Sequence, residues 1–539
     1  MTRIWLGGRL AEDLAYARAT GGVPLETWPR AVLFGAMHRL HKPHLPPLEP
    51  FRDPAFLRRH FPDCWLLLPR RDREAWVASR WHHDGGRSHK LWALHLGCGE
   101  AALPEIWRRD WDDHHALCGR LFAGDPRFRV LDMDGDWAGD LARALPELGL
   151  AGVAPDAPPR RPAPLTAPAQ IAAAAPDLAF AQSIADFCTR SDAAIQKRHG
   201  PQRFSALFAR WDGAGRILGS EKLPLPIVAE DLPGGARQYL AQPGLPKLER
   251  VEGAVNELWA LGHRRPLRMD LEDRRGFGTE ATGAPRQPLL VYNRPADGTS
   301  NMLLWPLPGY HTPGAVPYVT AQSADGVAWQ DKADVAAWRG NLSGRPVAAL
   351  GPGPGRGAHQ VLADLARGPG AADAALEREL LATTRYSVVR RFAGKPGFDL
   401  GLALPAHHAA AARHPLLAPY CGPRMPPAWF HGFRYLLSLA GRDGGSNFLS
   451  AAQSRGVVLK EDDGWDLFYS GAFRSWEHFI PLAPGAVDLE ERLDWARGNP
   501  LRCQKISAAA RNVCARIANL ETRRAWLRMV AEAASVQAP

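Results

Sequence analysis

The sequence has few cysteines and no long apolar run. Its seven cysteines are odd in number and widely spaced, and no two of them form a CxxC pair. Such a pattern is typical of reduced thiols rather than of a disulfide framework or a zinc site. No segment approaches the roughly 18 uninterrupted apolar residues of a membrane-spanning helix, and the N-terminal MTRIWLGGRLAEDLAYAR lacks the apolar core of a secretion signal. We therefore expect a cytoplasmic protein.

The composition is that of a folded, basic protein. Hydrophobic residues make up 46% of the 539 positions and include 19 Trp and 19 Phe, enough for two or three domain cores. The formal net charge of +10 favours anionic partners such as nucleotides, phosphates, acidic lipid headgroups or nucleic acid. An arginine-rich surface without a specific partner is the alternative. No nucleic-acid-binding module is recognisable, so we expect no nucleic-acid partner, while a peripheral contact with an anionic membrane surface stays open.

A segment rich in proline and alanine, residues 151–176, divides the chain. Its composition predicts an extended linker between a unit over 1–150 and a larger unit that follows it. A second stretch rich in glycine and proline, residues 346–377, predicts a loop insertion with one short helix. The chain shows no internal repeat.

Short apolar runs alternate with helical stretches in the larger unit. The runs PLLVYN, NMLLWPL, DVAAWRG, RYSVVRRF, FDLGLAL, FRYLLSLAG, GVVLKE and HFIPL predict short buried strands. Buried strands separated by helices indicate parallel sheets, so we expect an α/β fold class. Ligands of such folds collect where the carboxyl ends of strands meet helix N-termini, and the functional residues are sought there.

Four ordered motifs carry a family resemblance: WRGNLSGRP, TRYSVVRRFAGKPGFDLGL, YLLSLAGRDGGSNFLSAAQSRGVVLK and SWEHFIPL. In order and spacing they resemble glycosyltransferase family 90, over about 180–520 of the chain. The resemblance implies two Rossmann-like lobes of the GT-B type, over 177–325 and 326–539. It also implies inverting transfer of a sugar from a nucleotide-sugar donor, in the first place a UDP-sugar, without an obligatory metal or other cofactor. The implied acceptor is a hydroxyl of a cell-surface glycan or of a lipid-linked lipopolysaccharide or capsule precursor.

Inverting transfer needs a base that takes the acceptor's proton and positive groups that stabilise the departing diphosphate. The segment PLRMDLEDRRG carries Asp270, Glu272 and Asp273 after an apolar run, and its position matches the family stretch with the catalytic aspartate. By that register the resemblance assigns the general base to Asp273, with Asp270 as the second choice. Outside the family, such a cluster of acids is typical of a solvated turn.

The motif WRGNLSGRP offers backbone freedom and short hydrogen-bonding side chains for a diphosphate site. We expect this site to include Arg339, Gly340, Asn341 and Ser343. In the family, a diphosphate-binding arginine follows the motif by a few residues. An insertion in this chain makes either Arg345 or Arg385 the match, and we favour Arg385 because TRYSVVRRF continues in the family register.

The turn GRDGGS connects a predicted strand to a predicted helix. Ser446 is a natural N-cap, and exposed N–H groups at a helix start can bind an anion. The predicted anion site comprises Gly444, Gly445, Ser446 and Asn447. The turn by itself does not fit GxGxxG and is typical of ordinary strand-to-helix connections, whereas the resemblance implies contact with the diphosphate. Eukaryotic members carry an arginine where this chain has Asn447 and Phe448, so the positive charge must come from elsewhere, in the first place from Arg385.

The run GVVLKEDDGWDLFY carries two further candidates. Lys460 ends a predicted strand, and Asp466 matches an acid that the family places before its FY pair. The resemblance implies contacts with sugar or ribose hydroxyls. A charged loop with an apolar anchor is the alternative interpretation.

Residues 1–150 resemble bacterial sulfotransferases in FLRRHFPDCWLLLPRRDREAWVASRWHH. Arg71 and Ser79 keep the spacing of the pair that binds the 3′-phosphate of the sulfate donor. The family's phosphosulfate-binding loop is missing after the first predicted strand, so we interpret this unit as a sulfotransferase-like remnant with a scaffolding or acceptor-binding role. Asp132 and Asp134 form a DxD pattern, which holds a metal ion in other glycosyltransferases, but we expect no metal site here. A sulfotransferase acting on a glycan and a non-catalytic nucleotide- or glycan-binding protein are the alternative functions.

Overall fold

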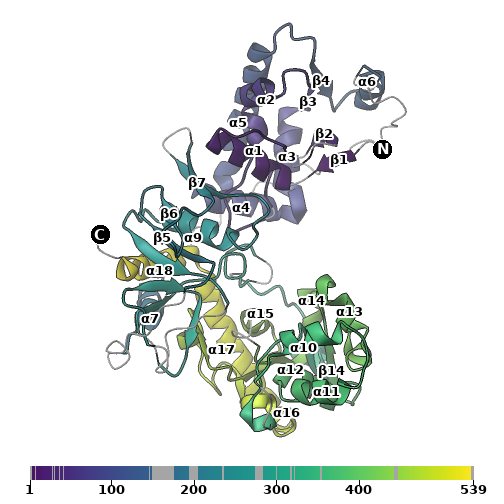
Figure 1. Cartoon of the computed structure of the whole chain (residues 1–539), viewed down its shortest axis with the longest axis vertical. Coiled ribbons are helices and arrows are strands. Elements are labelled where there is room, and N and C mark those ends of the chain that lie inside the picture. Colours follow the sequence, from purple (N-terminus) through teal and green to yellow (C-terminus); the bar gives the residue numbers. More distant parts are fainter. Residues whose placement is uncertain are drawn as a thin grey trace. The chain divides into compact units, whose positions relative to one another are not determined.

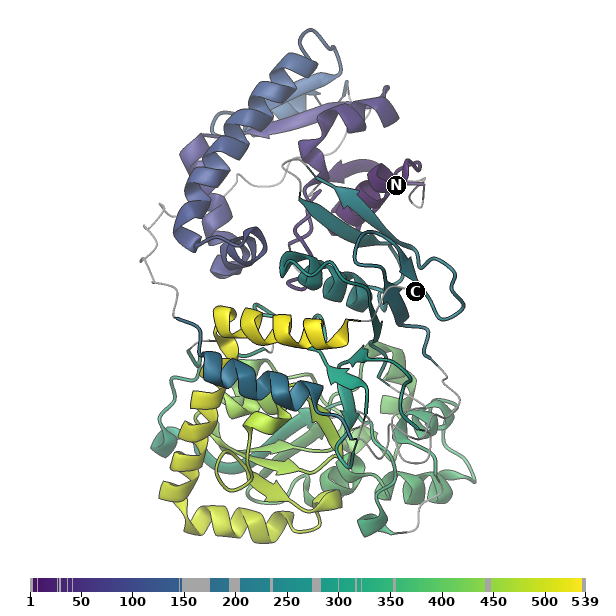
Figure 2. The same ribbon diagram turned by 90° about the vertical axis from the view of Figure 1, so that its left-hand side faces the viewer.

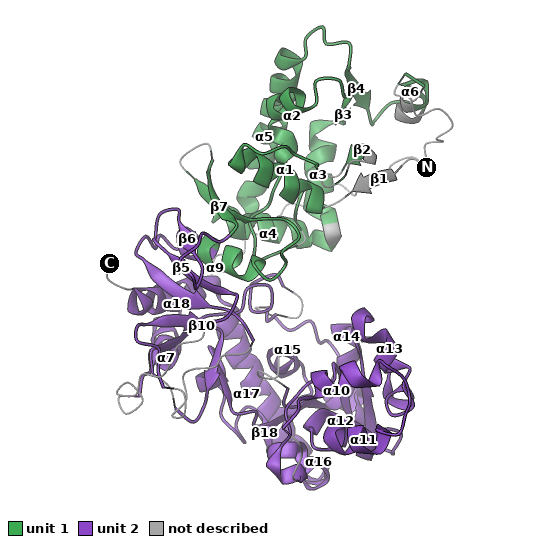
Figure 3. Cartoon of the chain, in the orientation of Figure 1, with its two compact units in different colours: residues 1–173, 226–256 green, residues 174–225, 257–539 purple. Residues whose placement is uncertain are grey.

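The chain forms two compact units, shown in different colours in Figure 3. The computed structural model describes residues 3–6, 8–26, 28, 31–35, 37–40, 42–144, 146–147, 175–192, 204–232, 236–273, 283–298, 300–315, 318–320, 322–351, 355–441 and 447–535. Unit 1 comprises 1–173 and 226–256, and unit 2 comprises 174–225 and 257–539. The first change of unit falls within the predicted linker, of which 151–174 lies outside the described residues. Residues 226–256, which we expected in a glycosyltransferase lobe, cluster with unit 1.

Unit 1 combines helices with two-stranded sheets. Two of the strand pairs are parallel: β1 (Arg3–Leu6) with β2 (Ala31–Gly35), and β3 (Leu66–Arg70) with β4 (Phe128–Asp132). The third is an antiparallel hairpin of β7 (Ile227–Asp231) and β8 (Arg237–Ala241). The helices are α1 (Gly8–Thr20), α2 (Pro54–His60), α3 (Arg73–His82), α4 (Arg87–Leu96), α5 (Leu103–Leu121), α6 (Trp137–Ala144) and α9 (Glu249–Ala260) (Figure 1).

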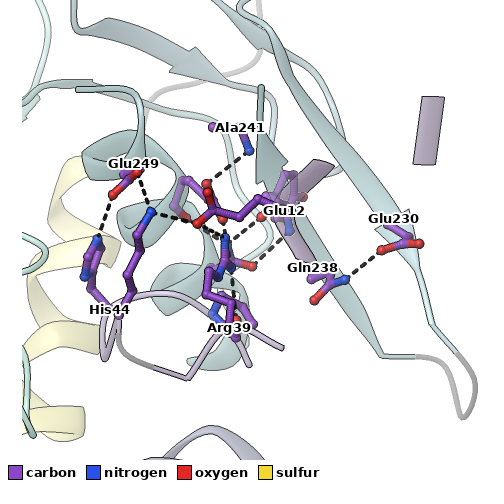
Figure 4. A network of polar contacts seen from close by, with 12 residues as sticks. Glu12, Arg39, His44, Glu230, Gln238, Ala241 and Glu249 are labelled. Carbon is purple, nitrogen blue, oxygen red and sulfur yellow. Dashed lines mark hydrogen bonds and ion pairs between the residues drawn. The ribbon is translucent and has the colours of Figure 1, made fainter. Parts of the chain in front are cut away.

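A buried charge network joins α1, α9 and the segment after β2 (Figure 4). Arg39 is 3% exposed, and its guanidinium lies 3.4 Å from Glu12 and 3.2 Å from Glu252. The Lys42 ammonium lies 2.7 Å from both Glu12 and Glu249. Burial raises the pKa of Glu252 to about 7, although Arg39 opposes this shift. The network thus gathers three carboxyl groups around the side chains of Arg39 and Lys42.

Unit 2 contains a first five-stranded sheet in the order β12-β10-β9-β5-β6. Its strands are β5 (Phe208–Trp211), β6 (Ile217–Leu218), β9 (Leu267–Asp270), β10 (Leu289–Val291) and β12 (Met302–Leu304). Strands β9, β10 and β12 are parallel, whereas β5 and β6 run antiparallel. Helices α7 (Leu178–Thr189) and α18 (Leu520–Ala534) pack side by side against β12 (Figure 2).

The second sheet of unit 2 is entirely parallel, in the order β14-β13-β15-β16-β18. Its strands are β13 (Ala333–Gly340), β14 (Phe398–Leu402), β15 (Phe433–Ser438), β16 (Val457–Glu461) and β18 (Ile480–Leu482). The associated helices are α10 (Ala358–Leu365), α11 (Asp373–Leu381), α12 (Thr384–Phe392), α13 (Ala409–Ala412), α14 (Pro427–Phe430), α15 (Phe448–Ala452), α16 (Leu489–Gly498) and α17 (Pro500–Ala518). In chain order this is the flavodoxin-like arrangement 2-1-3-4-5, whose switch point lies between β13 and β15. The predicted α/β class is confirmed.

Two local predictions were wrong. The run RYSVVRRF forms helix α12 rather than a strand, because Tyr386, Val389 and Phe392 recur three residues apart and are buried together. The remaining apolar runs form strands. The insertion over 346–377 contains α10 and the beginning of α11 rather than one helix. Among the described residues, no helix has the length and apolar character to cross a membrane.

Candidate functional site

The guanidinium of Arg385 lies at the carboxyl edge of the second sheet. Its Nη1 donates to the Asn341 carbonyl oxygen at 2.9 Å and to Ser343 Oγ at 2.7 Å, and its Nη2 donates to the Leu439 carbonyl oxygen at 3.2 Å. Asn341 and Ser343 follow β13, and Leu439 follows β15. A side chain from the first turn of α12 therefore bridges the two strand ends that flank the switch point, where sheets of this order bind their ligands.

Close approach of the chain around Arg385 depends on Gly441. A Cβ atom at this position would lie 2.6 Å from Arg385 Nη2 and 3.3 Å from Ser343 Oγ. The first distance is shorter than real carbon contacts, so a side chain here would push the guanidinium away. Glycine is thus required for the observed position of the arginine.

A buried carboxylate that the sequence analysis missed, Glu461, holds both sides of this site. It ends β16 and is 1% exposed. Its Oε1 accepts from Thr384 Oγ1 at 2.8 Å and from the Gly485 N–H at 2.7 Å, and its Oε2 accepts from the Ala440 N–H at 2.7 Å. Burial raises the pKa of Glu461. Because Thr384 precedes Arg385 and Ala440 follows β15, Glu461 positions the helix and the strand end together. An acid that closes the apolar run GVVLKE was the available sequence signal.

The other predicted residues around β13 have neighbours of their own. Arg339 forms an ion pair with Asp399 of β14, and its guanidinium lies 4.8 Å from the Trp429 ring centroid. At Gly340, a Cβ atom would lie 2.5 Å from the Trp338 side chain, so this glycine serves packing. Arg345 is exposed in the stretch that follows β13. The guanidinium of Arg385, by contrast, donates to the residues that follow both strands at the switch point.

The predicted anion site in the glycine turn is only partly visible. Residues 442–446, with Gly444, Gly445 and Ser446, lie outside the described residues. Asn447 is the N-cap of α15. Because this helix has five residues, few peptide dipoles add up to a positive potential at its N-terminus. The Asn447 amide donates to the Leu437 carbonyl oxygen at 2.9 Å and accepts from Ser438 Oγ at 3.3 Å. Asn447 therefore ties α15 to β15.

Asp273 lies at the carboxyl edge of the first sheet, three residues after β9. Its Oδ1 accepts from the Tyr292 hydroxyl at 3.0 Å, and Tyr292 directly follows β10. Asp273 is partly exposed, whereas Asp270 is fully buried and accepts from the Ser205 N–H at 2.9 Å and from Ser205 Oγ at 2.5 Å. A base must reach its substrate, so this geometry favours Asp273 over Asp270.

A short antiparallel ribbon joins the carboxyl edges of the two sheets. β11 (Asn293–Pro295) follows β10, β17 (Trp465–Leu467) follows β16, and Asn293 pairs with Leu467. A path along the chain runs from Glu461 to Leu467, crosses the strand pairing to Asn293 and ends one residue earlier, at Tyr292. This path is at most about 30 Å long. The ribbon therefore connects the sheet edge that carries Asp273 with the sheet edge that carries Arg385.

Asp466 stabilises this ribbon. It forms ion pairs with Arg190 and, at 3.6 Å, with the fully buried Arg294. Arg294 also donates to the carbonyl oxygens of Cys188 at 2.8 Å and Met302 at 3.0 Å. Burial lowers the pKa of Arg294 to about 10 and raises the pKa of Asp466. The carboxylate of Asp466 is thus committed to neighbouring arginines.

Lys460 projects to the face of the sheet opposite Glu461, since successive strand residues alternate. Its ammonium lies 5.6 Å from the Phe448 ring centroid and 5.7 Å from that of Phe479. It also donates to the Glu461 carbonyl oxygen at 3.2 Å. These contacts place Lys460 beside α15 rather than beside Arg385.

In unit 1, Arg71 lies in the short connection between β3 and α3, and Ser79 lies within α3. Arg71 Nε is buried and has no hydrogen-bond partner among the described residues. Asp134 accepts from the Asp72 N–H, and Asp132 accepts from the Asp134 N–H at 3.1 Å, so the DxD pattern organises a turn. Within the described part of the chain, no three His, Cys, Asp or Glu side chains gather in a way that could hold a metal ion.

Comparisons with known proteins give limited similarity. No family model matches the chain. The uncharacterized protein 027R of frog virus 3 (isolate Goorha) is 32% identical over 90 residues, which cover 16% of this chain and 9% of that protein. The uncharacterized protein 035R of invertebrate iridescent virus 3 is 34% identical over 54 residues, or 10% of this chain and 5% of that protein. The chain thus matches less than a tenth of the length of either curated relative.

Among solved structures, the crystal structure of TarM is similar over 78% of this chain and 89% of that chain. The TM-score is 0.30 and the sequence identity is 8%. A score of this size does not establish a common fold.

Proposed function

We propose that unit 2 is an inverting glycosyltransferase of the two-lobed GT-B type that uses a nucleotide-sugar donor, in the first place a UDP-sugar. The observation that carries the proposal is the position of Arg385, held by the ends of β13 and β15 at the switch point of a parallel sheet. An arginine fork suits phosphate oxygens, and a cation fixed at this point stabilises the negative charge of a departing nucleoside diphosphate. The sugar would be a hexose or a pentose.

In this proposal, Asp273 is the general base. Its carboxylate takes the proton of the acceptor hydroxyl while the oxygen of that hydroxyl attacks the anomeric carbon and the diphosphate leaves. The 3.0 Å hydrogen bond from the Tyr292 hydroxyl orients the Asp273 carboxylate at the edge of the sheet. The β11–β17 ribbon supports this arrangement, since it connects the carboxyl edges of the two sheets.

For the acceptor we propose a hydroxyl of a cell-surface glycan or of a lipid-linked lipopolysaccharide or capsule precursor. The formal net charge of +10 favours a peripheral contact with the anionic cytoplasmic surface of a membrane, and we propose that transfer takes place there without a membrane-spanning segment. For unit 1 we propose a scaffolding or acceptor-binding role.

The test separates binding from chemistry. A panel of nucleotide-sugars is first screened for thermal stabilisation of the chain, since a ligand of the folded state raises its melting temperature. Asp273→Asn should then abolish hydrolysis or transfer of the stabilising donor while its affinity changes less than about threefold. The neighbouring Glu272→Gln is the matched control and should retain turnover. Normal turnover by Asp273→Asn would exclude this base, and stabilisation without turnover by the wild type would indicate a non-catalytic binding protein.

A further inference from the structure

A polar groove of about 770 Å³ lies in unit 2 at the amino edge of the second sheet. One wall comes from residue 320 and residues 322–330, which precede β13, and another is the turn 453–455, which precedes β16. The third wall is one face of α17. Since Arg385 lies at the carboxyl edge, the groove and the candidate donor site occupy opposite edges of the same sheet.

The face of α17 that lines the groove has a helical period. Gln504, Ala508, Arg511, Asn512 and Ala515 follow one another at the spacing of residues on one side of a helix. The two alanines leave room between the polar side chains. Neither hydrogen bond nor ion pair is found for the Asn512 side chain within the part of the chain that the structure describes. The volume falls within the usual range of small-molecule sites, roughly 300–1,000 Å³.

Two arginines face this groove without a carboxylate of their own. Arg455 is exposed, and its guanidinium has no ion-pair partner among the described residues. Arg511 is half-buried and donates to Ser507 Oγ at 2.7 Å. Burial and the nearby charge of Arg455 lower the pKa of Arg511, so the two cations are close enough to repel each other.

The acidic side chain among the described lining residues, Asp325, is already neutralised. Its carboxylate accepts from the fully buried Lys332 ammonium at 2.8 Å and from the N–H groups of Arg455 at 2.6 Å and Val327 at 3.0 Å. The pKa of Asp325 is lowered even though burial opposes ionisation, because these donors stabilise the carboxylate. The Asp325 carboxylate forms its ion pair with Lys332, and its charge offsets only part of the effect that burial and Arg455 have on Arg511.

We propose that the groove binds the phosphate group of a small hydroxyl-bearing molecule between Arg455 and Arg511. Planar guanidinium groups match the oxygens of a tetrahedral anion, and a bound dianion removes the repulsion between the two cations. The amides of Gln504 and Asn512 lie along α17 on the same face and are suited to hydrogen bonds with hydroxyl groups. The site is independent of the proposed glycosyltransferase site.

The experiment measures phosphate affinity by titration calorimetry at constant ionic strength. Inorganic phosphate and glucose 1-phosphate are titrated into the wild-type chain and into Arg455→Gln, Arg511→Gln and the control Arg502→Gln. Arg502 is exposed on α17 but does not line the groove, so its replacement removes the same charge. We expect binding at least roughly tenfold weaker for the two groove variants, as for loss of one charge-assisted contact, and a change below twofold for the control.

Glucose 1-phosphate should bind the wild type more tightly than inorganic phosphate, because only the ester brings hydroxyl groups to the amides. Equal affinities for the two probes would overturn the hydroxyl-bearing part of the proposal. Absence of phosphate binding by the wild type, or equal affinity in all four proteins, would overturn the site itself. If Arg511→Gln disturbs the fold, the exposed Arg455→Gln alone decides the outcome.

Discussion

Unit 1 should lose stability as the pH rises through the range in which Glu252 ionises. The folded unit raises the pKa of this carboxyl from 4.5 to about 7, with burial as the largest cause. An acid whose pKa is higher in the folded state binds its proton more tightly there, so stability falls between about pH 4.5 and 7 and then levels off. The full difference corresponds to about 3 kcal/mol. Arg39 opposes the shift, whereas Glu12 and Glu249 add to it.

The perturbation is Glu252→Gln, which cannot ionise. Between pH 5 and pH 8 the wild type should lose about 2–3 kcal/mol relative to this variant, which is about 5–10 °C in melting temperature for a unit of this size. Calorimetry of the full chain measures the shift, and hydrogen exchange of α1 peptides identifies the transition of unit 1. Glu105→Gln, on the exposed side of α5, is the matched control and should follow the wild type. Parallel curves for Glu252→Gln and the wild type would refute this account of the network.

Two further substitutions test the architecture of unit 2. Gly441→Ala should displace the Arg385 guanidinium and so weaken UDP binding at least fivefold in calorimetric titration, while the melting temperature stays within a few degrees of wild type. Gly422 has open space around it, so Gly422→Ala is the control and should change neither the UDP affinity nor the melting temperature. Asp466→Asn should destabilise unit 2 by about 3 kcal/mol in chemical denaturation, because Arg294 is left buried without its carboxylate. A loss below about 1 kcal/mol would show that Asp466 does not hold the ribbon.

The sequence predicted the strands of unit 2 well, because continuous apolar runs of this length form buried parallel strands. It failed at RYSVVRRF, where apolar residues three apart form the buried side of α12. Residues 226–256, which we expected in a glycosyltransferase lobe, cluster with unit 1, where β7 and β8 contact α1 although more than 200 positions of sequence separate them. Such pairings depend on tertiary packing, which local patterns do not encode.

The candidate site was predicted in part. The resemblance of TRYSVVRRF to the motif of glycosyltransferase family 90 favoured Arg385. In the structure, the Arg385 guanidinium contacts both strand ends at the switch point. The ion pairs of Arg339 and Asp466 were not predictable, because their partners lie on other elements: Asp399 on β14 and Arg190 at the end of α7. Glu461 was missed because its positioning role depends on three hydrogen bonds from distant segments, and its place at the end of the run GVVLKE was the one local signal.

The most direct test of the central claim is the affinity of the chain for UDP with and without Arg385. Calorimetric titration should show binding to the wild type and a loss of at least roughly tenfold in Arg385→Gln, as for removal of one charge-assisted phosphate contact. Arg391→Gln, an exposed arginine of the same helix, is the control and should bind within twofold of the wild type. Equal affinities of Arg385→Gln and wild type for UDP would contradict the claim that this switch point holds the diphosphate.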